Sequence, residues 1–457
     1  MNLDLIVFFF FLFILLCLGW YKTANVQSET SYLLANRSTK LFPLVATLVM
    51  TEFNTSTLLG FSSVGLFVGA WGLLLPSVFL FGIGFYALTV AKKWKEYNGL
   101  STAGFFTEKY GKGLGKTASL FLLLAMIGFT ATYVKSMILI FQPIFPQTSE
   151  WMLGFALVSL VLLFTIRGGL VSIIRTDIFG FLAVLALIPA LLYFSWDYSG
   201  RNTLALVEHF PVQEASKALP LSFIGSLVVL TMFTYISAPW YSQKIFSAES
   251  STVAFRAVCI SSILVFLLYG FPVLATGFYS LSSPENINAQ IAIPQLIDVA
   301  FPHGWRGFAY GVFLMAGSTT LAGVWSAMTT MVVGDFLGQN ETKLGRSVLL
   351  TSIWAILAYV LGIVVVDDIL NKLILANIPV AALSFALLGG FYWKGITKFG
   401  VYASVFIGFF WGIFCFLYWG EEGSYTLYWA FGGIPMTFAV GILGSLLTKK
   451  TIPNIKT

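Results

Sequence analysis

Charge is scarce in this chain. Only 10% of its 457 residues are Asp, Glu, Lys or Arg, whereas hydrophobic residues make up 58% and aromatic residues 17%. A soluble domain carries about 25% charged residues. The scarcity therefore excludes a soluble globular protein, because so much apolar surface could not be hidden from water. The sequence predicts a polytopic protein of the lipid bilayer.

Cysteine and histidine are also rare. Cys17, Cys259 and Cys415 lie far apart in apolar runs, and His209 and His303 lie in polar connections. These spacings fit neither a disulfide framework nor a zinc site. No nucleophile motif or paired acid–base set accompanies them, so the sequence does not predict an enzyme.

Long apolar runs are abundant instead. A helix needs about 20 apolar residues to cross the hydrocarbon core of a bilayer. The first run lacks the basic start and the small-residue cleavage site of a signal peptide, so we expect it to be retained as a membrane helix. We predict thirteen spans, at 3–21, 41–66, 69–91, 117–142, 151–166, 169–196, 220–242, 253–280, 305–334, 347–366, 369–393, 397–419 and 427–448.

The basic residues alternate between successive connections. Lys and Arg follow each odd-numbered span, as in KKWK (92–95), and are scarce after the even-numbered spans. Basic connections favour the cytoplasmic side. The pattern supports thirteen spans and predicts a multi-pass protein of the plasma (inner) membrane, with the N-terminus outside and the C-terminus in the cytoplasm. The net charge of +6 then belongs to inside loops and does not indicate nucleic-acid binding.

Two of the predicted spans are interrupted at similar depth. TEFNTST (51–57) places a carboxylate and an amide inside a span, and TYISAPW (234–240) contains Pro239, which cannot continue a helical hydrogen-bond ladder. The two spans lie five apart and therefore run in opposite directions, as an inverted repeat of five helices requires. Broken helices in corresponding positions indicate a midplane binding site in secondary transporters.

Seven segments follow one another along the chain in a recognisable order. They are SYLLANRS (31–38), VMTEFNTSTLLG (49–60), FFTEKYGKG (105–113), RGGLVSIIRTD (167–177), SQKIFSAES (242–250), AGSTTLAGVWSAMTTMVVGDF (316–336) and FYWKGITKFGVYAS (391–404). In this order they resemble the sodium:solute symporters, which include the sodium/proline, sodium/pantothenate, sodium/sialic acid and sodium/sugar carriers. The resemblance covers nearly the whole chain and implies an all-α, LeuT-like membrane protein of about 13 transmembrane helices. Two inverted five-helix repeats (41–196 and 220–393) would form one transporter domain (1–457), with one extra helix before them (3–21) and two after (397–448).

The resemblance implies a sodium site between the first and eighth helices of the repeats. Its ligands would be the carbonyls of Met50, Phe53 and Ala316 and the hydroxyls of Thr319 and Thr320. The last three residues are spaced i, i+3, i+4 and share one helical face. Five neutral oxygens suit a monovalent cation better than a divalent one, which prefers carboxylates. Sodium is therefore the expected coupling ion, although threonines on a membrane helix also serve helix packing.

Three further polar residues are implied to support this sodium site. Glu52 stands where the sodium/proline carriers have an aspartate, and its side chain is one methylene longer. Asp177 resembles an acid that supports the site from another helix, and an ion pair with Arg175 is the other explanation for it. The supporting residues are Glu52, Asn54 and Asp177.

The substrate site is less sharply defined by the sequence. Lys135 lies about 10 Å from the outer end of its span at 1.5 Å per residue. Its ammonium would bind a substrate carboxylate or extend outward to the membrane surface. Thr57, Tyr235 and Trp240 flank the two breaks and are candidates for substrate contact or gating. For the two aromatic residues, packing or a place at the membrane interface is the other explanation. The predicted solute is an amino acid or another small organic carboxylate.

Together these features predict a secondary active transporter that carries a small organic solute with sodium by alternating access. Its expected partners are the solute, sodium and the bilayer. One alternative is a proton-coupled carrier of the same fold, with Glu52 or Asp177 as its proton site. Another is a transporter-like membrane sensor that works with a separate partner, because the tail after Lys449 is too short for an output domain.

Overall fold

The computed structural model describes residues 3–20, 37–97, 99, 101–165, 169–282, 287–337, 344–421 and 424–448. Most of the SYLLANRS segment, the first residues of RGGLVSIIRTD and the tail from Lys449 lie outside these ranges. Within them every element is a helix, apart from a single backbone bridge between Thr39 and Ala248. The predicted all-helical class is confirmed.

Each of the thirteen predicted apolar runs falls on one helix or on a series of consecutive helices. The described helices are α1 (Leu3–Trp20), α3 (Leu41–Glu52), α4 (Thr55–Val68), η3 (Gly69–Leu74), α5 (Ser77–Tyr86), η4 (Ala87–Ala91), α6 (Lys92–Glu96), α7 (Thr102–Tyr110), α8 (Lys112–Phe141), α9 (Glu150–Thr165), α10 (Gly169–Tyr198), α11 (Thr203–His209), α12 (Val212–Ala218), α13 (Leu221–Tyr235), α14 (Pro239–Ser247), α15 (Ser251–Ser280), η5 (Ala289–Ile291), α16 (Ala292–Ala300), α17 (Trp305–Val332), η6 (Val333–Leu337), α18 (Leu344–Val364), α19 (Ile369–Leu375), α20 (Ile378–Ala381), α21 (Ser384–Tyr392), α22 (Lys398–Trp419), α23 (Tyr425–Tyr428), η7 (Trp429–Gly433) and α24 (Ile434–Thr448).

Fewer described helices are long and apolar enough to cross a membrane than the thirteen predicted spans. Among the described residues, eight helices are long and apolar enough to cross a membrane, or up to ten if each of two bent helix pairs is one span. Several predicted spans fall on shorter apolar helices, such as Leu3–Ile14 and Glu150–Leu163. The multi-span class is therefore confirmed, while the number thirteen stays a prediction.

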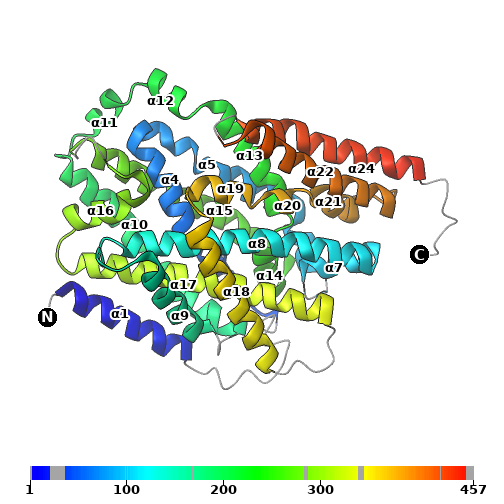
Figure 1. Ribbon diagram of the computed structural model, residues 1–457, viewed down its shortest axis with the longest axis horizontal. Coiled ribbons are helices and arrows are strands. Elements are labelled where there is room, and N and C mark those ends of the chain that lie inside the picture. Colours follow the sequence, from blue (N-terminus) through cyan, green and yellow to red (C-terminus); the bar gives the residue numbers. More distant parts are fainter. Residues whose placement is uncertain are drawn as a thin grey trace.

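The helices are arranged around α8, which crosses the middle of the molecule. Helices α1 and α17 lie on one side of it, and α22 and α24 lie on the other (Figure 1). Helices α11, α12 and α16, from connections predicted outside, lie toward the left of the view, whereas α7, from a connection predicted inside, lies toward the right (Figure 1). This placement agrees with successive connections facing opposite sides of a membrane.

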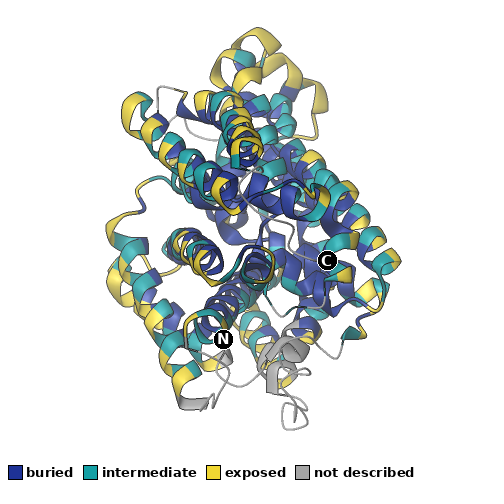
Figure 2. Ribbon diagram, turned by 90° about the vertical axis from the view of Figure 1, so that its right-hand side faces the viewer, coloured by how far each residue is buried: buried dark blue, intermediate teal, exposed yellow. Residues whose placement is uncertain are grey.

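The interior is one continuous apolar core. Buried residues gather toward the centre of the molecule and exposed ones toward its rim (Figure 2). Trp94, Trp325 and Trp429 are fully buried in this core. Large apolar side chains such as Leu88 and Leu417 are more than 70% exposed. Exposed leucines of this kind are compatible with lipid, whose tails are as apolar as the side chain itself.

Candidate functional site

The helix of the second predicted span breaks where the sequence places its polar residues. Helix α3 ends at Glu52, Phe53 and Asn54 adopt extended backbone conformations, and α4 begins at Thr55. Asn54 caps α4, because its side-chain oxygen accepts a hydrogen bond from the Thr57 amide at 2.8 Å. Its side-chain nitrogen donates to the Glu52 carbonyl at 2.8 Å. The predicted break is confirmed, and Asn54 satisfies backbone groups on both sides of it.

Tyr269, on α15, also stabilises this break, through hydrogen bonds to backbone groups of Glu52 and Asn54. Its hydroxyl donates to the Glu52 carbonyl at 2.5 Å and accepts from the Asn54 amide at 2.9 Å. In an unbroken helix that amide would bond to the Met50 carbonyl, four residues earlier. The Met50 carbonyl instead accepts a long contact of 3.4 Å from the Thr320 hydroxyl on α17. It is therefore available to a further ligand.

The second break has a different cause, the proline of TYISAPW. Helix α13 ends at Tyr235, and α14 begins at Pro239, whose missing N–H is tolerated in the first turn of a helix. Ala238 is extended, as the residue before a proline prefers. The Ile236 carbonyl freed by the break accepts the Trp94 indole N–H at 2.9 Å. This break is also confirmed.

A small cavity of about 20 Å³ lies beside the first break. Such a volume holds about one water molecule or one small ion. Met50, Thr319 and Thr320 line it, so the fold brings together three of the five predicted sodium ligands. The Ala316 carbonyl oxygen accepts a long hydrogen bond of 3.4 Å from the Thr319 hydroxyl. Ala316 and Phe53 are buried but are not among the lining residues.

A buried ion pair closes one wall of this small cavity. Asp177, on α10, and Lys244, on α14, both line it, and the Lys244 ammonium lies 3.5 Å from the Asp177 carboxylate. The Thr47 hydroxyl donates to the same carboxylate oxygen at 2.5 Å. Asp177 is 2% exposed and Lys244 is 4% exposed. Asp177 thus lies at the predicted sodium site, with Lys244 as its ion-pair partner.

Lys244 is a site residue that the sequence pattern does not predict. It follows an odd-numbered predicted span, as the other basic residues of predicted inside connections do, whereas α14 carries it into the protein interior. One signal was available: Lys244 follows Pro239 by five residues, which is about 7.5 Å of helix at 1.5 Å per residue. A lysine so close to a helix break is within reach of a midplane site.

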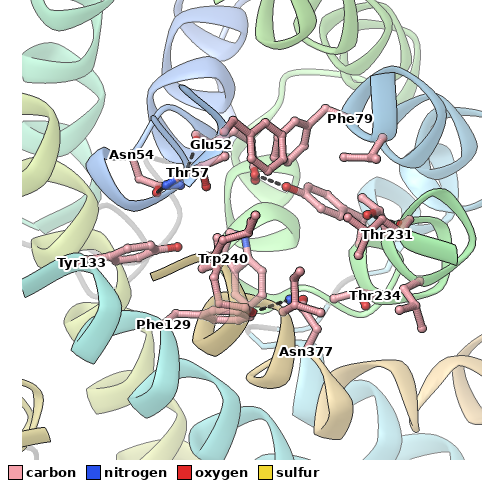
Figure 3. Close-up of a pocket in the computed structure, with 18 of the residues that line it drawn as sticks. Glu52, Asn54, Thr57, Phe79, Phe129, Tyr133, Thr231, Thr234, Trp240 and Asn377 are labelled. Carbon is pink, nitrogen blue, oxygen red and sulfur yellow. Dashed lines mark hydrogen bonds between the residues drawn. The ribbon is translucent and has the colours of Figure 1, made fainter. Parts of the chain in front are cut away.

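A larger cavity, of about 90 Å³, lies between the two breaks. Figure 3 shows Glu52, Asn54 and Thr57 from the first break on one side of it and Trp240 and Phe129 facing them. Tyr235 also lines this cavity, and its hydroxyl donates a hydrogen bond to Glu52 Oε2, which connects the two broken helices directly. The cavity therefore sits where the sequence predicts a solute site.

Glu52 contributes the carboxylate of the larger cavity, although it is only 4% exposed. Its second oxygen, Oε1, has no hydrogen-bond partner among the described residues. Glu52 and Asn54 line the larger cavity and do not line the small one. Their predicted role in supporting sodium stays a prediction, and the structure places both residues at the larger cavity.

The remaining substrate candidates divide into two groups. Thr57, Tyr235 and Trp240 line the larger cavity, as their predicted role requires. Lys135 does not line it; its ammonium lies 2.7 Å from the carboxylate of Glu150 at the start of α9. The structure therefore does not bring Lys135 to the cavity.

Trp240 has a special position because it lines both cavities. Its ring packs edge-to-face against Phe129, with 5.1 Å between the ring centroids. A ligand in either cavity would contact the same indole. The sequence pointed to Trp240 as a residue near a break, but its shared position depends on how α14 packs against α3 and α17.

Comparison with solved structures shows that the fold is shared with known transporters. The chain matches a Na⁺-coupled sialic acid symporter in a substrate-bound, outward-open state, with a TM-score of 0.84 and 13% identity over 100% of this chain and 99% of the other. It also matches Mhp1, a nucleobase-cation-symport-1 family transporter, in a closed conformation with bromovinylhydantoin bound (TM-score 0.60, 13% identity, 92% and 96% coverage). MhsT in complex with L-phenylalanine gives a TM-score of 0.56 at 13% identity, with 89% and 99% coverage.

Comparison by sequence gives a narrower result. A family model described as a spore germination protein matches residues 69–296, a little under half of the chain. That match includes the second break but neither the first break nor α17. No curated protein matches the chain by sequence. The structural matches confirm the predicted LeuT-like fold, and they do not single out the sodium:solute symporter family.

Proposed function

We propose that this chain is a secondary active transporter that carries a small organic solute together with sodium. The observation that carries the proposal is the meeting of two broken helices, joined by the hydrogen bond from Tyr235 to Glu52, around a cavity of about 90 Å³. Broken helices at one depth supply the binding site of alternating-access carriers. The two predicted inverted repeats, 41–196 and 220–393, would rock around this site.

Sodium is proposed to occupy the small cavity. The Met50 carbonyl and the Thr319 and Thr320 hydroxyls supply neutral oxygens on two different helices, and a volume of about 20 Å³ fits one ion. The Asp177 carboxylate adds a negative charge at the wall. An ion bound there would connect α3 to α17 and stabilise the arrangement in which the solute cavity is formed. Its inward movement is favoured by about 2.3 kcal/mol per 100 mV of membrane potential.

The coupling between the two ligands is proposed to pass through Trp240, which contacts both cavities. A ligand in one cavity would fix the Trp240 side chain in one conformation. A ligand that then binds in the other cavity would lose less conformational entropy, because the shared indole is already ordered. Linkage requires that the solute tighten sodium binding by the same factor by which sodium tightens solute binding. The proposed setting is the plasma membrane, with the N-terminus outside and the C-terminus in the cytoplasm.

A second candidate function is favoured by one observation, the ammonium of Lys244 at the wall of the small cavity. A fixed cation already neutralises Asp177 there, and it would repel a second cation. In this alternative the chain is a sodium-independent carrier of the same fold, driven by protons or by the solute gradient itself. The two candidates differ in whether sodium binds at all.

The test is equilibrium binding of sodium-22 to the purified protein in detergent. Thr320→Val removes one ligand hydroxyl while preserving the shape of the side chain. Thr330→Val is the matched control, because the Thr330 hydroxyl donates to Ser326 within α17, away from the cavity. Saturable sodium binding that Thr320→Val weakens about tenfold and Thr330→Val leaves intact supports sodium coupling. Absence of sodium binding in the wild type would favour the sodium-independent carrier.

A further inference from the structure

We infer that the larger cavity selects a small protonated primary or secondary amine, whose ammonium group is recognised by Glu52 and by the aromatic rings around it. This inference rests on the proposed transport function and names the class of solute. It differs from the carboxylate that the sequence predicts, because that expectation depended on Lys135. Lys135 is paired with Glu150 and does not line the cavity.

The first step of the argument is the state of the Glu52 carboxylate. Tyr235 donates a hydrogen bond to Oε2, while the buried Oε1 has no hydrogen-bond partner among the described residues. The Trp240 indole N–H is a second neutral donor that interacts with the carboxylate, but it does not meet hydrogen-bond geometry at Oε1. A buried acceptor without a donor is costly. An N–H of a bound ammonium would satisfy it.

The second step concerns charge. Glu52 is the one charged side chain among the described residues that line the larger cavity. The buried Lys244 ammonium lines the other cavity, where Asp177 and not Glu52 is its ion-pair partner. A buried carboxylate is costly unless a positive charge lies beside it or it takes up a proton. A cationic solute would supply that charge, whereas a carboxylate solute would place a second negative charge beside the first.

The third step is the aromatic lining. Phe79, Phe129, Tyr133, Tyr235 and Trp240 all border the cavity. Ring faces attract cations, and the attraction increases when the cation is desolvated. An ammonium bonded to Glu52 would have aromatic rings around it (Figure 3). The Glu52 carboxylate and the aromatic rings therefore both favour a positively charged solute.

The volume limits the size of the solute. In either cavity, one water molecule needs about 10–15 Å³. The cavity of about 90 Å³ therefore has room for a compound of roughly six to nine heavy atoms. Propylamine is a suitable probe, and 1-propanol and propionate are its neutral and anionic counterparts. Tetramethylammonium keeps the charge but has no N–H to donate.

The experiment is calorimetric titration of the purified full-length protein with these four probes at fixed sodium concentration. We expect propylamine to bind at least about tenfold more tightly than 1-propanol, as a hydrogen bond to a charged group implies. We expect propionate not to bind measurably and tetramethylammonium to bind more weakly than propylamine. Glu52→Gln should remove the preference for the amine over the alcohol, and Glu52→Asp should retain part of it.

Glu150→Gln is the matched control, because it neutralises a carboxylate that does not line the cavity. It should leave the preference for propylamine unchanged. The inference would be overturned if propionate bound more tightly than propylamine, if tetramethylammonium bound as tightly, or if Glu52→Gln kept the amine preference. A chain that binds propionate in a sodium-dependent manner would still be a transporter, so that result contradicts the inference alone. A chain that binds neither sodium-22 nor any of the four probes contradicts the proposed function as well.

Discussion

Each of the two cavities is lined by one buried carboxylate, but only the carboxylate of the small cavity has an ion-pair partner among the described residues. In the small cavity the Asp177 carboxylate is paired with Lys244 at 3.5 Å and accepts a hydrogen bond from Thr47. In the larger cavity the Glu52 carboxylate has only neutral donors beside it, and Oε1 has no hydrogen-bond partner among the described residues. Both carboxylates are almost fully buried. The protein therefore supplies the counter-charge of Asp177 itself, whereas the charge of Glu52 is left to be balanced by a ligand or a proton.

The difference also separates structural from functional use of a buried charge. A buried ion pair whose partners both belong to the protein is part of the folded structure, and removing one partner leaves an uncompensated charge. A buried charge without a partner destabilises the ligand-free protein. A ligand of opposite charge removes that cost, so the same charge favours the ligand-bound protein. Substitution of Asp177 should therefore mainly lower the stability of the protein, whereas substitution of Glu52 should mainly weaken the binding of its ligand.

The largest effect is expected from Asp177→Asn. The substitution leaves the Lys244 ammonium buried without its counter-charge, which costs about 3 kcal/mol or more in free energy of unfolding. Thermal or denaturant unfolding of the purified protein measures the loss. The double variant Asp177→Asn with Lys244→Met removes both charges and should recover most of the stability. A double variant as unstable as the single one would show that the pair is not the cause.

Lys244→Met should produce the next largest effect, and it should depend on sodium. The substitution frees Asp177 and removes a cation from the wall of the small cavity. The variant should be destabilised without sodium and bind sodium at least about tenfold more tightly than the wild type. Binding at 100 times the dissociation constant stabilises a protein by about 2.7 kcal/mol. A sodium-induced rise in Tm no larger than that of the wild type would contradict this expectation.

Trp240→Phe should mainly affect communication between the cavities. The substitution keeps an aromatic ring, but the smaller phenyl group replaces the indole that lines both cavities. Coupling free energies between two ligands are typically about 1–3 kcal/mol. We expect the factor by which sodium tightens propylamine binding to fall toward one. Trp71→Phe serves as control, because the Trp71 indole donates to the Leu219 carbonyl and lines neither cavity. An unchanged factor in Trp240→Phe would exclude the indole as the link.

The smallest effect is expected from Glu52→Gln on the stability of the empty protein. Glu52 has no ion-pair partner to lose among the residues that the structure describes, and a neutral amide avoids burying a charge. Its free energy of unfolding should stay within about 1 kcal/mol of the wild type or rise, in contrast to Asp177→Asn. A loss as large as that of Asp177→Asn would mean that Glu52 is also balanced within the protein.

The sequence predicts the framework of this molecule well because membrane helices obey strong local rules. Apolar runs locate the helices, and the polar TEFNTST and the proline of TYISAPW locate both breaks. The i, i+3, i+4 spacing places Thr319 and Thr320 on one face, and both line the small cavity. These features depend on neighbouring residues in the chain, so they can be read without knowing how the helices pack.

The rest depends on contacts between distant segments. Lys244 reaches Asp177, 67 residues earlier, and Tyr269 reaches the break at Asn54, 215 residues earlier. Charge alternation assigns Lys244 to a connection predicted inside but cannot show that α14 turns its side chain toward Asp177. Lys135 illustrates the converse: its position suggested a solute site, whereas Glu150 on the neighbouring helix is its partner. Helix packing, which no local pattern specifies, decides each of these cases.

The most direct test of the two-cavity mechanism is sodium-22 binding to the purified wild-type protein, titrated with and without saturating propylamine. If sodium occupies the small cavity and an amine the larger one, propylamine should tighten sodium binding several-fold, and sodium should tighten propylamine binding by the same factor. Sodium binding that is absent, or that is unchanged by the amine, would contradict the proposal that the two cavities form one coupled transport site.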